Sequence, residues 1–224
     1  MKEIYFIRHG ESEYNEWRRR SFYNCSCCCV CDPMIYDAPL SKTGRQQVET
    51  LRSQVQAVDG LASKVQLVVT SPLSRAIDTC LGSFFPTPTT TDTSTPAPHT
   101  TYGSRPLVIA LHRERLHKSG DVGIATSELH AKYGDDRLDL SELEQHVHPE
   151  QWWYDDEAVP AGGVQVIVQE TTQQTKLRVD LFLQWLSNRP ETCIAVVGHS
   201  AYIKTLTKMS RKLNNCEIKL FEIE

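Results

Sequence analysis

Short apolar runs alternate with segments of helical periodicity along this chain, and this alternation restricts the possible folds more than any other feature. The runs are rich in β-branched residues and short enough to be buried strands; they fall at residues 4–7, 65–70, 107–110 and 193–197. Between the first two runs, apolar residues recur at spacings of three and four, as on one face of a helix. The order strand–helix–strand predicts an α/β fold with a mostly parallel sheet.

Two of the predicted helices carry recognisable start signals. Thr43 is the expected N-cap of the first, with Gln46 at the capping-box position. The apolar face of this helix comprises Val48, Leu51, Val55 and Val58. Ser71 is the expected cap of the second helix, in which Pro72 occupies the first position. Arg75 then falls in the first turns of that helix, near the carboxyl end of the strand at 65–70. A further long helix is predicted over residues 164–186.

Two polar segments interrupt this pattern. Residues 85–106 are mostly Thr, Pro and Ser and contain too little apolar surface to order themselves, so a flexible insertion is expected there. Residues 118–160 predict a small helical cap or lid, and the aromatic cluster Trp152, Trp153 and Tyr154 is expected to attach it to the core. The sequence thus predicts one domain over residues 1–224 that carries both segments.

Size and charge exclude several classes of function. The 224 residues suit one α/β domain, and 40% hydrophobic residues are enough for a core. The net charge of −4 argues against a nucleic-acid partner. We expect no membrane span, because no apolar stretch approaches 20 residues. Met1-Lys2-Glu3 leads directly into the first strand, so a cytoplasmic location without a signal peptide is expected.

Five of the eight cysteines lie within seven residues: Cys25, Cys27, Cys28, Cys29 and Cys31. A long, apparently cytosolic chain is not expected to use them as a disulfide framework. No second Cys or His pair with zinc-ligand spacing follows. A reduced, irregular loop is the favoured interpretation, and metal binding, acylation and a redox role stay open.

The chemistry-bearing residues follow the predicted strands. Arg8-His9-Gly10 comes directly after the first strand, Gly198-His199-Ser200 follows the last, and Arg75 follows the strand at 65–70. The carboxyl ends of parallel strands meet at one edge of a sheet, so two Arg and two His are expected to converge there. Such a cluster repels itself unless an anion neutralises it, and a phosphoryl group fits the guanidinium fork.

Taken in order along the chain, these motifs resemble those of the histidine phosphatase superfamily, also called the phosphoglycerate mutase-like family. The residues that carry the resemblance are Arg8-His9-Gly10-Glu11-Ser12 with Asn15, Leu40-Ser41-Lys42-Thr43-Gly44, Ser71-Pro72-Leu73-Ser74-Arg75, Glu114, and Gly198-His199-Ser200. With the elements above, the resemblance predicts a three-layer α/β/α architecture whose central sheet is mostly parallel and which carries a small helical cap insertion.

The resemblance also implies a role for each matching residue. His9 is the expected nucleophile, which becomes a phosphohistidine, and Arg8, Arg75 and His199 are expected to bind the phosphoryl oxygens. Asn15 is a further expected phosphate contact. Glu114 is the expected general acid, which protonates the leaving oxygen and later activates water. Neither a metal nor a cofactor is implied, since fixed cations stabilise the charge of the transferring group.

Within the family, hydrolysis is favoured over mutase activity. After Asn15 this chain has Glu16-Trp17-Arg18-Arg19-Arg20 where mutases have a Trp/Gly-rich stretch, and it lacks their Tyr-Gly after the acid. The prediction is a phosphomonoester hydrolase that acts on a small phosphorylated substrate. A phosphoglycerate mutase-type phosphotransferase and a non-catalytic phospho-ligand-binding protein are the alternatives. The sequence leaves the substrate's identity and the oligomeric state open.

Overall fold

The computed structural model describes residues 1–23, 32–57, 59–86, 101–146, 148–154 and 167–223. The cysteine cluster at 25–31 lies outside the described residues, as does most of the segment expected to be a flexible insertion. The described strands are β1 (Lys2–Arg8), β2 (Leu67–Thr70), β3 (Leu107–Val108), β4 (Cys193–Gly198) and β5 (Ile218–Ile223). The α-helices are α1 (Glu13–Tyr23), α2 (Lys42–Val55), α3 (Ser74–Phe84), α4 (Thr126–Tyr133), α5 (Ser141–Glu144), α6 (Thr172–Asn188) and α7 (Ser200–Thr207).

The described strands form one mixed sheet in the order β3-β2-β4-β1-β5. β1, β2, β3 and β4 are mutually parallel, and the register pairs Arg8 with Gly198 at the carboxyl ends of β1 and β4. The prediction of an α/β fold with a mostly parallel sheet is therefore confirmed. β5 was not predicted; it pairs antiparallel with β1, at the edge of the sheet, and is only partly buried.

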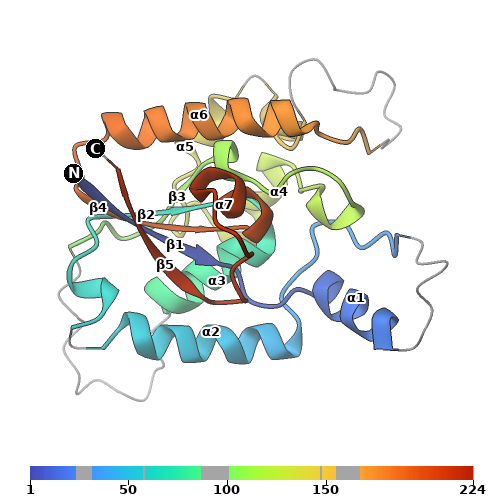
Figure 1. Ribbon diagram of the computed structural model, residues 1–224, viewed down its shortest axis with the longest axis horizontal. Helices are drawn as coiled ribbons and strands as arrows, with labels where there is room; N and C mark the ends of the chain where they lie inside the picture. The colour runs from blue at the N-terminus through green and yellow to red at the C-terminus, as the bar shows by residue number, and fades with distance from the viewer. Residues whose placement is uncertain (24–31, 58, 87–100, 147, 155–166, 224) are drawn as a thin grey trace.

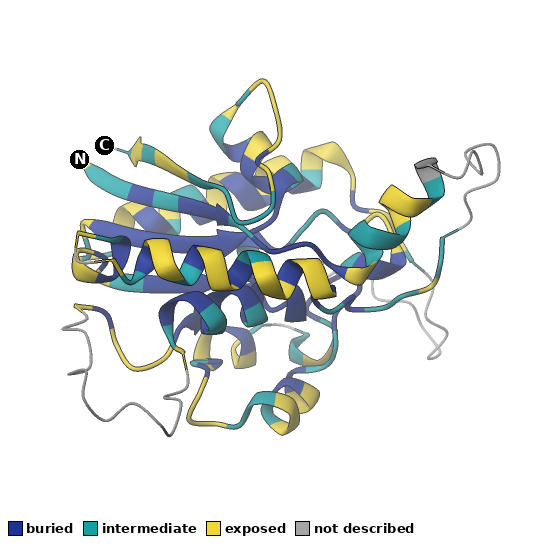
Figure 2. Ribbon diagram, turned by 90° about the horizontal axis from the view of Figure 1, so that it is seen from below, coloured by how far each residue is buried: buried dark blue, intermediate teal, exposed yellow. Residues whose placement is uncertain are grey.

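Helices cover both faces of this sheet (Figure 1). On one face, Phe182 of α6 and Ile203 of α7 pack against Phe6 and Val196. On the other, residues of α2 and α3 pack against Ile7, Val68 and Val197. α2 lies across that face with its exposed side turned to solvent (Figure 2). The three-layer architecture follows from this alternation of faces along the strands.

Two of the predicted helix starts were wrong by two residues each. Ser41, not Thr43, caps α2, and its hydroxyl accepts a hydrogen bond from the Gly44 N–H at 3.0 Å. α3 begins at Ser74 rather than at Pro72, with Leu73 as its N-cap residue. Ser71 instead contacts His199 through its hydroxyl. In both loops a serine is held by a tertiary partner, which shifts the helix start.

The third predicted helix, over residues 164–186, began too early. The structure describes this helix as α6, from Thr172 to Asn188, and residues 167–171 before it are not helical. Thr171 caps α6 through a capping box with Gln174, which accounts for its start.

The polar segment after residue 118 contains α4, α5 and two short 3-10 helices, η4 (Ser119–Asp121) and η5 (Pro149–Gln151). Trp152 is fully buried in an apolar cluster. The cluster includes Leu73, which directly precedes α3, and Ile77, which belongs to α3. The indole of Trp152 also lies so close to Gly123 that a Cβ at that position would be 2.1 Å from the ring. The aromatic residues thus attach the segment to the core of the molecule.

No helix in the described ranges combines the length and the apolar character that crossing a bilayer requires. The two ends of the described chain lie side by side, since Lys2 pairs with Ile223 in the β1–β5 ladder (Figure 1).

Candidate active site

The structure brings His9 and His199 together at the carboxyl edge of the sheet. The backbone N–H of His9 donates to the carbonyl of Gly198 at 3.0 Å, which continues the β1–β4 pairing by one residue. As a result, the two imidazole rings lie 5.1 Å apart, centroid to centroid. Both side chains are buried. Arg75 reaches the same place from α3, as the strand order predicts.

Close backbone packing holds the loop that follows β1. A Cβ on Gly44 would lie 2.0 Å from the carbonyl oxygen of Glu11, so only glycine permits this approach of α2 to the loop. The Ser41 hydroxyl donates to a Glu11 carboxylate oxygen at 2.9 Å, and the Gly10 N–H donates to the Thr79 hydroxyl at 3.0 Å. Residues 40–44 therefore fix the position of the loop that carries His9.

The hydrogen bond of His9 defines its tautomer. Nδ1 lies 2.6 Å from the carbonyl oxygen of Gly10. A carbonyl only accepts, so Nδ1 carries the proton and Nε2 carries the lone pair. Burial lowers the pKa of His9 well below its usual value, and the charges of Arg75 and Arg8 lower it further. His9 is thus a neutral imidazole at physiological pH.

His199 is fully buried beside His9, and its Nε2 lies 2.8 Å from the Ser71 hydroxyl. Its Nδ1 is buried and, among the described residues, has no hydrogen-bond partner. Burial lowers its pKa well below the usual value, with Arg75 and His9 acting in the same direction. In the described structure both rings are therefore uncharged beside two guanidinium groups.

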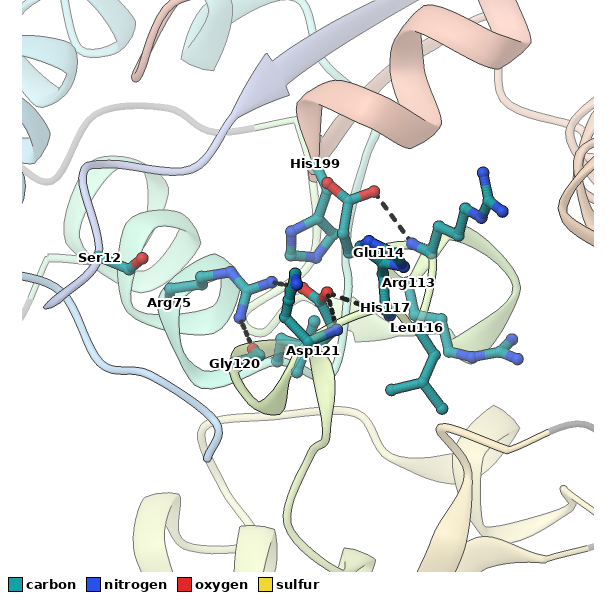
Figure 3. A network of polar contacts seen from close by, with 12 residues as sticks. Ser12, Arg75, Arg113, Glu114, Leu116, His117, Gly120, Asp121 and His199 are labelled. Carbon is teal, nitrogen blue, oxygen red and sulfur yellow. Dashed lines mark hydrogen bonds and ion pairs between the residues drawn. The ribbon is translucent and has the colours of Figure 1, made fainter. Parts of the chain in front are cut away.

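The two arginines have different contacts. Arg8 Nη1 donates to the carbonyl of Leu213 at 2.8 Å, while its buried Nε has no partner within the described part of the chain. Arg75 donates to the carbonyl of Gly120 and, through Nη2, to Asp121 Oδ1 at 3.1 Å (Figure 3). Burial lowers the pKa of Arg8, and Glu114 opposes that shift.

The carboxylate of Glu114, a residue of the loop that follows β3, lies against the N-terminus of α7. Its Oε1 accepts from the backbone N–H of Tyr202 at 3.2 Å and of Arg115 at 3.0 Å, and its Oε2 accepts from Ala201 N–H at 3.4 Å. A carboxylate at a helix N-terminus satisfies otherwise unpaired donors there. Glu114 thus stabilises α7 as well as facing the site.

Asn15 lies in the first turn of α1, a helix that the sequence reading did not predict. Its backbone N–H donates to the Ser12 hydroxyl at 3.2 Å, so Ser12 caps this helix. Asn15, His9, Arg8, Arg75 and Glu114 all line one cavity of about 630 Å³. Every site residue expected from the sequence therefore lines this cavity, except His199, which is buried next to it.

Asp121 also lines the cavity and was missed by the sequence reading. Burial raises its pKa and Glu114 raises it further, while Arg75 opposes the shift. Asp121 is separated from Arg75 by 46 positions, and no motif around it indicates the contact. The only available signal was that a buried arginine needs an acidic partner. Within the described ranges, no group of three or more His, Cys, Asp or Glu side chains is arranged to hold a metal ion.

The mostly parallel sheet with two histidines at its carboxyl edge defines an α/β class of protein, and comparisons with known proteins agree with this class. Residues 4–92 match the model of the histidine phosphatase superfamily, branch 1, so the predicted resemblance is confirmed. The chain is 26% identical to phosphoglycerate mutase-like protein 2 of Arabidopsis thaliana, over 98% of this chain and 73% of that protein.

Two solved structures share the fold. The α-ribazole phosphatase of Shigella flexneri superposes with a TM-score of 0.52 at 17% identity and covers 99% of this chain and 91% of its own. A phosphoserine phosphatase variant from Entamoeba histolytica, in complex with phosphoserine, gives a TM-score of 0.50 at 16% identity and covers 100% of this chain and 92% of its own.

Proposed function

We propose that this protein is a phosphomonoester hydrolase that works through a phosphohistidine at His9. The observation that carries the proposal is the state of His9. Its Nδ1 is held by the Gly10 carbonyl, so the lone pair is on Nε2, and the ring is kept neutral at the wall of a cavity that Arg8 and Arg75 also line. A neutral imidazole held beside two cations is suited to attack a bound phosphoryl group.

The proposed reaction has two steps. The Nε2 lone pair forms a bond to phosphorus, the bond from phosphorus to the ester oxygen breaks, and the leaving oxygen takes a proton from a carboxylic acid of the cavity wall. Water then attacks the phosphohistidine, gives a proton to the same carboxylate, and releases inorganic phosphate while the electron pair returns to Nε2. Glu114 is the acid that the family pattern indicates.

The size and the lining of the cavity favour a small phosphorylated substrate. Its volume of about 630 Å³ exceeds that of a phosphate ion, and Lys118 and Gly120 of the polar segment contribute to its wall. We therefore also propose that residues 118–160 form a cap of the single domain and contribute to substrate selection. The names of both solved relatives as phosphatases favour hydrolysis over the mutase alternative.

The test is a panel of phosphomonoesters with the wild type and His9→Gln, combined with trapping of a labelled phosphoenzyme. The wild type should release phosphate and retain the label, and His9→Gln should do neither. His130→Gln is the matched control, because His130 lies outside the cavity and contacts Asp135 and Glu144. Isomerised phosphoglycerate in excess of released phosphate would indicate a mutase. Binding without label or turnover in the wild type would refute an enzymatic function.

A further inference from the structure

The peptide unit between His9 and Gly10 is held by side chains on both of its sides. The Gly10 N–H donates to the hydroxyl of Thr79 in α3 at 3.0 Å. The carbonyl oxygen of His9 accepts from Nδ2 of Asn215 at 2.9 Å. Because a peptide unit is planar and turns as one body, its N–H and its carbonyl cannot change direction independently. The two hydrogen bonds therefore fix the orientation of the His9–Gly10 peptide.

This peptide needs side-chain contacts because the strand pairing of β1 ends beside it. The His9 N–H still pairs with the carbonyl of Gly198, but α7 begins at Ser200, so β4 does not continue along the His9 carbonyl. Among the described residues, Asn215 is the one donor to that carbonyl. Gly10 adds freedom, since it has no Cβ to restrict its torsion angles. The Asn215 amide thus supplies a contact that the sheet does not.

Asn215 is placed next to His9 by a tight turn over residues 214–217. The Glu217 N–H donates to the carbonyl of Asn214 at 3.1 Å, which closes the turn. Cys216, inside it, has a φ of 58°, a left-handed conformation that residues other than glycine seldom adopt. The Cys216 N–H donates to the Arg8 carbonyl at 2.9 Å. The turn is therefore tied to the end of β1, directly before His9.

The orientation of the His9–Gly10 peptide also decides where the acceptor for the His9 ring lies. Nδ1 of His9 donates to the carbonyl of Gly10 at 2.6 Å. A rotation of the His9–Gly10 peptide changes the torsion angles of Gly10 and turns this carbonyl away from Nδ1. Without that acceptor, the proton of the neutral ring can reside on either nitrogen. A ring with its proton on Nε2 has no lone pair there to attack phosphorus.

We propose that Asn215 is a positioning residue for the nucleophile: its amide holds the His9–Gly10 peptide so that the Gly10 carbonyl keeps the ring proton of His9 on Nδ1. This inference rests on the proposed function and deepens it. Asn215 is not one of the described residues that line the cavity, so it acts through His9 and not through the substrate.

The first experiment measures how fast His9 acquires a labelled phosphoryl group in Asn215→Ala and Asn215→Asp. Asn215→Asp keeps the shape of the side chain, but its carboxylate has no N–H to donate. In single turnovers with rapid quenching, both variants should be labelled about 10-fold more slowly than the wild type, or slower still, because a small displacement of a reacting group is costly. Their affinity for tungstate should stay close to that of the wild type, because the arginines that bind an oxyanion are unchanged.

Asn214→Ala is the matched control for both variants. Asn214 is the neighbouring residue of the same type, its side chain is exposed, and it contributes its backbone N–H and carbonyl to the turn. Alanine keeps both backbone groups, so Asn214→Ala should be labelled at the rate of the wild type.

The second experiment determines the tautomer of His9 by NMR of protein with ¹⁵N-labelled histidine rings, with His9→Gln to assign the signals. The wild type and Asn214→Ala should show a protonated Nδ1 and an unprotonated Nε2. Asn215→Ala should show a mixture of the two tautomers. A purely structural loss, such as lower stability, would leave the tautomer of the folded protein unchanged. The measurement needs neither substrate nor turnover.

The outcomes distinguish this inference from the proposed function. A wild type that acquires no label refutes the proposed function, and the NMR measurement still decides the role of Asn215. An unchanged tautomer in Asn215→Ala refutes that role, as does an unchanged rate of labelling in an active protein. A wild-type rate in Asn215→Asp would show that only the shape of the side chain matters. An equal loss in Asn214→Ala would assign the effect to the turn as a whole. Either result would overturn the inference.

Discussion

The buried ion pair between Arg178 of α6 and Glu170 offers the sharpest test of what holds the site in place. Arg178 Nε lies 2.7 Å from Oε1 and Nη2 lies 2.8 Å from Oε2 of Glu170, a two-pronged arrangement. Arg178 Nη1 also donates to the carbonyl of Leu111 at 2.7 Å and of Arg113 at 3.2 Å. Glu170 accepts from the N–H of Leu116 at 3.3 Å. The pair therefore anchors the chain on both sides of Glu114.

The perturbation is Glu170→Gln, which keeps the shape of the side chain and removes its charge. The exposed fractions are 7% for Arg178 and 3% for Glu170, so water cannot solvate the charge that remains. Leaving one partner of a buried pair uncompensated costs about 3–5 kcal/mol. Stabilities of single domains are about 5–15 kcal/mol, so this change removes a large share of the free energy of unfolding.

The assay is urea unfolding of Glu170→Gln, Arg178→Met and the double variant. The double variant removes both charges, keeps an amide oxygen that can accept from the Leu116 N–H, and takes the Arg178 donor away from the carbonyls of Leu111 and Arg113, at about 1–3 kcal/mol for each carbonyl that water cannot reach. It should therefore cost less than the sum of the single variants. Glu16→Gln is the control, because its pair with Arg20 is exposed and should contribute about 0.5 kcal/mol or less.

Two results would refute this reasoning. One is a cost below about 1 kcal/mol for Glu170→Gln with an unchanged m-value, which would mean that the remaining guanidinium finds water. The other is strict additivity in the double variant, which would show that the two charges do not stabilise each other in the folded protein.

Three further predictions follow from other parts of the structure. Gly44→Ala should destabilise the protein by at least about 2 kcal/mol, because the new Cβ meets the Glu11 backbone, whereas Gly103→Ala, with open space around it, should be nearly neutral in urea unfolding. Burial raises the pKa of Asp37 to about 6, so the stability that its neutral form contributes is complete below about pH 4 and is lost as the pH rises through 6. Asp37→Asn should therefore gain stability relative to the wild type, by up to about 3 kcal/mol, between pH 4 and pH 7; a constant difference across that range would contradict this assignment. Since burial and the charges of Arg75 and Arg8 lower the pKa of His9, the acid limb of kcat/KM should lie well below pH 6.5 and should move to higher pH in Arg8→Met, and an unmoved limb would argue against this electrostatic effect.

The strands were predictable because their information is local. Continuous apolar runs such as Ile194-Ala195-Val196-Val197 bury both faces of a central parallel strand, and such a run has few other stable uses. β5 escaped prediction because it is a partly buried edge strand whose place depends on pairing with β1. α1 escaped for a similar reason: its start depends on the Ser12 hydroxyl, and its sequence is largely polar.

Helix starts show how tertiary contacts override local signals. Thr43 and Ser41 are both acceptable caps by residue type. Ser41 is used because its hydroxyl bridges the Gly44 N–H and the Glu11 carboxylate, and Glu11 lies 30 positions away. The residues close to position 43 in the sequence do not indicate the contact with Glu11.

The candidate active site shows the same contrast between local sequence signals and tertiary contacts. The sequence by itself determined that Arg8, His9, Arg75 and His199 would converge, because residues that follow parallel strands share one edge of the sheet. Only the tertiary structure decided which nitrogen of His9 holds the lone pair and which carboxylate contacts Arg75. Those choices depend on single hydrogen bonds between distant segments, and a hydrogen bond depends on distances of a few tenths of an ångström that no residue pattern encodes.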